Sequence, residues 1–210
     1  MIRKPFLLLS AGLVVAIAAC DNSTGVSSSI TQADANDLAA QMDAVSTLGP
    51  ADFRLGSTFA IVAGGSGPAA VGTPLTINNQ FTVTKQCPKG GQVAIAGTVT
   101  GTGDASTHTF SLEARATRTD TDCAFQTKDG TLTLNGNPNI AYDGKLNIVS
   151  AALSGLQTQT HKGSFSWARI GGSGVCDVDI TSSFDPATHT ATVSGTFCGV
   201  AVNVTQTRGA

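Results

Sequence analysis

Residues 109–117 read TFSLEARAT, and the character of the side chain changes at every position of this stretch. The apolar side chains are Phe110, Leu112, Ala114 and Ala116, and polar or charged residues stand between them. Successive side chains of a β-strand point to opposite faces, so a period of two predicts a strand with one buried face.

The same alternation recurs from about residue 77 to residue 207. Turn-forming dipeptides divide this region into short segments: Asp129-Gly130, Asn135-Gly136 and Asp143-Gly144, with a long strand predicted near 145–160. Connections this short join antiparallel neighbours. The sequence therefore predicts an all-β fold, with an antiparallel meander over 77–207 that forms a sandwich or a partly closed barrel.

One helix is predicted before the strands. Thr31 is a suitable N-cap, Leu38, Met42 and Val45 recur at helical spacing, and Gly49-Pro50 is a stop signal. This pattern predicts a short amphipathic helix within 31–49 that packs on the sheet as a lid or brace, with partner binding as the alternative. Residues 50–76 are predicted to hold a strand near 52–62 and a Gly/Pro-rich connection.

The N-terminus carries the features of a secretion signal. Arg3 and Lys4 precede an apolar run over 6–19, which is shorter than the about 20 apolar residues that a membrane span needs. The run ends in Ile17-Ala18-Ala19-Cys20, which resembles the lipobox of bacterial lipoproteins over about the first 25 positions. This resemblance implies a signal peptide at 1–19, lipid on Cys20 and a flexible tether at 20–30. The alternative is an ordinary signal peptide followed by a cysteine that is there by chance.

Composition also indicates a compartment outside the cytoplasm. Only 12% of the residues are charged, against a usual 25%, while 28 are Thr and 24 are Gly. The β region resembles Thr/Gly-rich lipoproteins of environmental bacteria in composition, a likeness that implies no activity. Without Arg3 and Lys4 the formal net charge is −4, which argues against nucleic acid as a partner.

Four cysteines follow Cys20, and an even number behind a secretion signal predicts two disulfides. Side-chain parity places Cys87 and Cys123 on inward faces. A four-residue turn at 185–188 would place Cys176 opposite Phe197, and a β-bulge near 195–198 would then bring Cys198 opposite Cys176. Of the three possible connectivities, this reasoning favours Cys87–Cys123 with Cys176–Cys198.

The three histidines, His108, His161 and His189, lack neighbours at metal-ligand spacing, so no metal site is predicted. His108 and His189 share the context Thr-His-Thr, which indicates either repeated strand starts or a pair of sites.

Carboxylate pairs and aromatic residues are the other candidates for chemistry. Asp177 and Asp179 share one strand face, and Asp120 and Asp122 lie beside a turn. Each pair could bind Ca²⁺ or act as acid and base, but fits a solvent-exposed face better. Trp167 is predicted to fill the core. No catalytic or cofactor-binding motif is recognisable, so neither an enzyme nor a cofactor is predicted.

These observations lead to two hypotheses. The first is a lipid-anchored protein of the bacterial cell envelope, periplasmic or surface-exposed, with a non-enzymatic structural or protein-interaction role. Its partners would be the membrane, through the lipid on Cys20, and an unknown envelope protein. The alternative is a binding module that holds an apolar or lipid-like ligand in a barrel or β-clam cavity. A large apolar cavity would favour the binding module, and a filled core would favour the first hypothesis.

Overall fold

A computed structural model describes residues 30–53, 75–104, 106–136 and 140–208. The described part holds one α-helix, α1 (Gln32–Ser46), one 3₁₀ turn, η1 (Pro50–Phe53), and eleven strands. The strands are β1 (Leu75–Gln86), β2 (Gln92–Asp104), β3 (Thr109–Thr121), β4 (Cys123–Thr127), β5 (Gly130–Asn135), β6 (Ile140–Val149), β7 (Ala152–Leu153), β8 (Gln157–Arg169), β9 (Gly172–Asp185), β10 (Thr190–Phe197) and β11 (Val200–Thr207).

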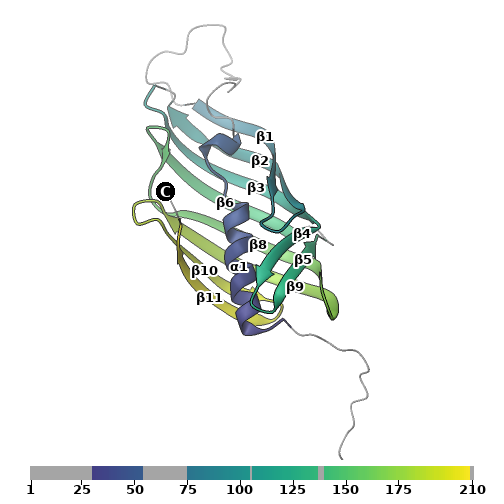
Figure 1. The fold of residues 1–210 in the computed structure, drawn as a ribbon. Coiled ribbons are helices and arrows are strands. Elements are labelled where there is room, and N and C mark those ends of the chain that lie inside the picture. The colour runs from purple at the N-terminus through teal and green to yellow at the C-terminus, as the bar shows by residue number, and fades with distance from the viewer. Residues whose placement is uncertain (1–29, 54–74, 105, 137–139, 209–210) are drawn as a thin grey trace, which may run out of the picture.

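All the strands belong to one antiparallel sheet, which confirms the all-β prediction (Figure 1). The neighbours along the sheet are β1-β2-β3-β6-β8-β9-β10-β11, so the chain forms a meander from which only β7 and the β4–β5 hairpin depart. Strand β7 pairs with β6, and β5 pairs with the last part of β8. The sheet is open rather than closed into a barrel.

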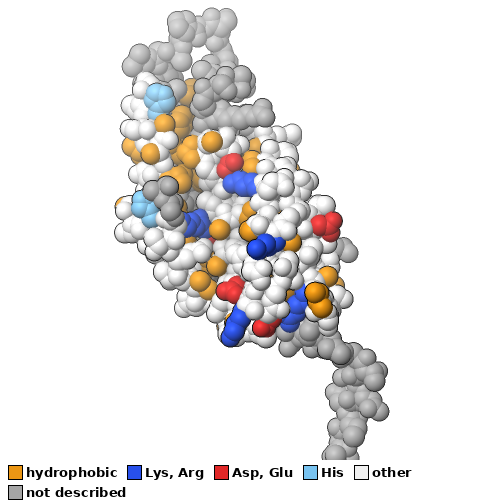
Figure 2. All heavy atoms as spheres, in the orientation of Figure 1, with side chains coloured by type: hydrophobic (Ala, Val, Ile, Leu, Met, Phe, Trp, Pro, Cys, Tyr) orange, Lys and Arg blue, Asp and Glu red, His pale blue; other side chains and the backbone are white. Residues whose placement is uncertain are grey.

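Helix α1 packs on the sheet, as predicted, and lies across one face of it beside the β4–β5 hairpin (Figure 1). It contacts β10 and β11 at one edge of the sheet and also β1 and β2 at the other edge. One helix reaches both edges because the sheet curves around it, and we call the side that holds α1 the concave face. Figure 2 shows that the visible surface is mostly uncharged and polar, in keeping with the low charge content.

The ends of α1 follow the predicted signals. The Thr31 hydroxyl accepts a hydrogen bond from the Asp34 amide at 3.2 Å, which satisfies one of the free N–H groups of the first turn. The helix ends at Ser46, three residues before Gly49. The prediction of a strand from residue 52 is wrong at its start, because Pro50–Phe53 forms the 3₁₀ turn η1. The rest of the predicted strand lies outside the described residues.

The predicted turn at Asp143-Gly144 is wrong, because β6 runs straight through it. A Cβ atom on Gly144 would come within 2.8 Å of the Tyr142 hydroxyl, so the glycine makes room for that ring rather than for a turn. The turn lies instead at Ser150-Ala151, where φ is +52° and +64°. The single long strand predicted near 145–160 is therefore divided among β6, β7 and β8.

The predicted register of the last hairpins is also wrong. Asp185 pairs with Thr190, so the four-residue turn is 186–189 rather than 185–188. Strand β10 keeps one register with β9 down to Phe197, which faces Val178, and has no bulge. The change of apolar parity comes from a two-residue turn at Cys198-Gly199, which places Phe197 opposite Val200. Both turn residues have positive φ.

Candidate functional site

Two disulfides join Cys87 to Cys123 and Cys176 to Cys198, the two predicted pairs, although the β-bulge from which the second was derived is absent. The first joins the β1–β2 turn to the start of β4, with Cα atoms 5.4 Å apart. The second joins β9 to the β10–β11 turn, with Cα atoms 4.7 Å apart. Cross-links across such loops stabilise a fold by about 3–4 kcal/mol each in the chain-entropy description. Cys20, the predicted lipidation site, lies outside the described residues.

The shared context of His108 and His189 has a structural explanation. Each histidine has φ of +53° and directly precedes a strand, and an aspartate four residues earlier, Asp104 or Asp185, ends the strand before it. The Oδ1 atom of that aspartate accepts a hydrogen bond from the backbone amide two residues later, at 2.8 Å and 2.9 Å respectively. The repeated sequence is therefore a turn motif, Asp-x-x-Thr-His-Thr, in which side-chain hydrogen bonds fix the backbone.

The predicted carboxylate pair of β9 lies on the outer face of the sheet. Asp177 and Asp179 are exposed, and Asp179 forms an exposed ion pair with Lys162 at 2.7 Å. Among the residues that the structure describes, no group of three or more His, Cys, Asp or Glu side chains could hold a metal ion. Trp167 is only 7% exposed and belongs to the core, as predicted.

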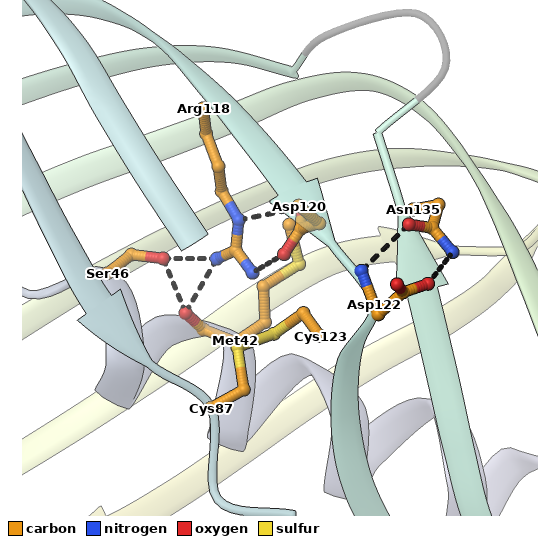
Figure 3. The surroundings of a disulfide bond; sticks show 8 residues. All are labelled: Met42, Ser46, Cys87, Arg118, Asp120, Asp122, Cys123 and Asn135. Carbon is orange, nitrogen blue, oxygen red and sulfur yellow. Dashed lines mark hydrogen bonds and ion pairs between the residues drawn. A yellow bond between two sulfur atoms is a disulfide. The ribbon is translucent and has the colours of Figure 1, made fainter. Parts of the chain in front are cut away.

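A buried ion pair lies between β3 and α1 (Figure 3). The Arg118 guanidinium donates to both carboxylate oxygens of Asp120, at 3.1 Å and 2.6 Å, and both side chains are fully buried. Arg118 also donates to the Met42 carbonyl at 3.0 Å and to the Ser46 hydroxyl. This cluster fastens the last turn of the helix to the centre of the sheet. Asp120 is thus separated from Asp122, whose exposed carboxylate accepts from Asn135 at 3.1 Å.

A second buried cluster surrounds Asp43, a residue of α1 with no exposed surface. Its carboxylate accepts hydrogen bonds from Gln159 on β8, Ser182 on β9 and the guanidinium of Arg208. Tyr142 on β6 extends the network by donating its hydroxyl to the Gln159 side-chain oxygen at 3.1 Å. Side chains from β8, from β9 and from the residue after β11 therefore donate to one helical carboxylate, and a buried charge requires such partners.

Two titratable groups beside this network are kept neutral. Burial and the nearby negative charges of Asp43 and Asp52 raise the pKa of Tyr142. Burial and the positive charge of Arg118 hold the pKa of His161 well below its usual value of 6.5. The His161 ring lies edge-on to Tyr142, with centroids 5.3 Å apart, and neither ring nitrogen has a hydrogen-bond partner among the described residues. His161 is therefore an uncharged side chain of the core.

A small pocket adjoins Asp43 between the end of the helix and the sheet. Tyr142, Gln157, Phe184 and Arg208 are among its lining residues. Its free volume of about 20 Å³ is room for about one water molecule. An acyl chain or a comparable apolar ligand needs a far larger space, since small-molecule sites commonly have volumes of several hundred Å³.

Further ion pairs fix both ends of α1. At the N-terminal end, Asp34 is buried and pairs with Arg169 at 2.7 Å. Burial acts to raise the pKa of Asp34, but the side chains of Thr127 and Arg169 outweigh that effect and lower it. Just beyond the C-terminal end, Lys85 donates to the Thr47 carbonyl and pairs with Asp52 at 3.1 Å. The buried polar groups of this interface therefore position a helix, and they do so by pairing with one another.

Sequence reasoning missed this polar interface, although a signal was present. Arg118 and Asp120 share the even parity of Phe110 and Leu112 along the same strand, which places them on the inward face. Asp43 lies at helical spacing after Ala39. Because charged residues were assumed to lie on the surface, the prediction missed that these side chains are buried.

Searches against protein-family models, curated proteins and solved structures find no match to this chain. No helix among the described residues combines the length and the apolar character that crossing a membrane requires.

Proposed function

We propose that this protein is a lipid-anchored lipoprotein of the bacterial cell envelope, with a non-enzymatic structural or protein-interaction role. The sequence at Ile17-Ala18-Ala19-Cys20 supports the anchor, and the two disulfides are compatible with an oxidising compartment outside the cytoplasm. The partners in this proposal are the membrane, through the lipid on Cys20, and an envelope protein.

The observation that carries the proposed role is the filled concave face. Where a β-clam would hold a ligand, this protein holds α1, with buried Leu38 and Met42 against the sheet and Asp43 in a network of hydrogen bonds. Among the described residues of the concave face, the pocket beside Asp43 is too small for an apolar ligand. A filled interior supports a rigid display domain over the alternative of a lipid-binding module.

Native mass spectrometry of the protein, extracted gently from its own membrane, tests the proposal. We expect a chain that begins at Cys20, carries diacylglycerol and an N-acyl group, and lacks four hydrogens because of two disulfides. A Cys20→Ser variant is the matched control, and we expect it to lose the lipid mass and its membrane partitioning.

Two results would contradict the proposal. An unlipidated mature chain, or a Cys20→Ser variant with unchanged mass and partitioning, would remove the anchor. A reproducible bound apolar molecule in addition to the covalent lipid would favour the binding module.

A further inference from the structure

The turn between β8 and β9 carries the most exposed large apolar side chain among the described residues. Ile170 occupies this two-residue turn, between Arg169 and Gly172, and its side chain is completely exposed. Val175, on the outer face of β9, is 72% exposed. Single exposed apolar side chains are common, but a fully exposed isoleucine at a hairpin tip, with a second exposed apolar side chain further along β9, is a candidate contact surface.

This turn is also almost free of charge. Between Lys162 and Asp177 the only charged residue is Arg169, and its guanidinium is already paired with buried Asp34. Small residues such as Ser173 and Gly174 occupy much of the remaining tip. Placing this surface against an apolar phase would therefore leave few charges without water, the nearest exposed one being Asp177 on the same face of β9 as Val175.

The tip lies where the predicted tether enters the domain. Ile30, the first described residue, lines one surface hollow together with Trp167 and Val175. Figure 1 shows that α1 begins at the same end of the molecule as the β8–β9 turn. Ten residue steps separate Cys20 from Ile30, and at about 3.5 Å per step they span at most about 35 Å. A lipid on Cys20 would hold this end of the domain close to the bilayer.

We propose that the β8–β9 tip, with Ile170 and Val175, rests in the bilayer surface when Cys20 carries its lipid. This inference depends on the lipid anchor of the proposed function. The lipid retains the protein, and the tip is a second contact that fixes its orientation. The opposite end, with the Asp-x-x-Thr-His-Thr turns, then points away from the membrane toward envelope partners.

The chain contains its own reporter of this orientation. Trp167 is the only tryptophan, and it lies on β8 three residues before Ile170. The test uses the full-length lipidated protein in phosphatidylcholine vesicles whose acyl chains carry bromine, which quenches tryptophan emission at close range. We expect quenching of Trp167 that does not depend on salt concentration, because the contact is apolar.

Two matched variants distinguish the tip from a general effect of the lipid. Ile170→Asp should reduce the docked population at least about tenfold, because burying a carboxylate in place of isoleucine costs more than the 1.4 kcal/mol that corresponds to a factor of ten. Leu156→Asp changes an exposed residue just before β8, and 14 residue steps along the strand place it about 45 Å from Ile170. This control should leave the quenching unchanged.

The outcomes separate the two proposals. Lipidated protein with unquenched Trp167, or equal quenching in Ile170→Asp and the parent protein, would overturn the membrane contact while leaving the anchor intact. A mass spectrum without lipid on Cys20 would overturn the proposed function and this inference with it. Quenching that Ile170→Asp abolishes and Leu156→Asp retains would support the contact.

Discussion

The two halves of the inner face of β3 differ in chemistry although both are buried. Phe110, Leu112 and Ala114 form an apolar first half, with at most 7% exposure. Arg118 and Asp120 lie on the same face four and six residues after Ala114, and both are charged and equally buried. Side-chain parity therefore decides which face of a strand is buried, while the neighbouring element decides which side chains that buried face can accept.

The neighbouring element is the C-terminal end of α1. A helix concentrates partial negative charge at that end, and α1 has no basic residue in its last turn. The sheet supplies the cations instead: Arg118 reaches the Met42 carbonyl, Lys85 the Thr47 carbonyl, and Arg208 the Thr47 hydroxyl. The charged half of the face is thus complementary to the helix that covers it.

Removing the arginine of the charged half should have the largest effect. Arg118→Ala leaves Asp120 buried without its partner, and we expect the free energy of unfolding to fall by about 3–5 kcal/mol. Chemical denaturation followed by circular dichroism measures this loss. The double variant Arg118→Met, Asp120→Leu should regain most of it, because neither charge remains. A loss below about 1 kcal/mol in Arg118→Ala would show that the pair is not buried.

The apolar half should respond through packing alone. Leu112→Ala leaves a cavity in a filled core, and we expect a loss of about 3 kcal/mol in the same assay. This loss should not depend on salt or on pH between 5 and 8. A strong salt dependence would contradict the separation of the face into an apolar half and a charged half.

Acid should destabilise the fold through His161, which is buried on β8 beside Tyr142. Its pKa is lowered in the folded state, so below pH 6.5 the unfolded chain binds a proton that the folded chain does not. The free energy of unfolding should therefore fall as pH decreases below 6.5, by up to about 1.4 kcal/mol per pH unit. Denaturation series at pH 7.5, 6.5 and 5.5 measure this slope.

The matched variants for this effect are His161→Leu and His189→Asn. The leucine variant should lose the slope, and the variant of the turn histidine should keep it, because asparagine tolerates the positive φ at that position. Equal slopes in the two variants would show that His161 is not the group responsible.

The smallest effect is expected on the outer face. Lys162 and Asp179 form an ion pair there, but both side chains are more than half exposed. Water and salt screen such a pair, so Lys162→Ala should leave the denaturation midpoint unchanged within error. A shift comparable with that of Arg118→Ala would contradict the contrast between buried and exposed pairs.

Alternation and capping predicted the all-β meander, the helix with its Thr31 cap and the inward faces of Cys87 and Cys123. The pair Cys176–Cys198 was also predicted correctly, although the β-bulge used to derive it is absent. Turn dipeptides were less reliable. Gly144 leaves space for the Tyr142 ring instead of forming a turn, and the actual turn is at Ser150 and Ala151. The prediction of the register around Cys198 was wrong, because a two-residue turn changes strand parity without any bulge. The Asp43 network joins residues more than 100 positions apart, and no local pattern reports such a contact.

Amide hydrogen exchange of α1 tests most directly the claim that this helix is a fixed part of the core. We predict that the amides from Leu38 to Ser46 exchange as slowly as those of β3, only when the whole domain unfolds. Exchange of the helix well before β3, with the sheet still protected, would contradict this claim. It would show that α1 leaves the concave face of the folded protein and opens the space that the binding-module alternative requires.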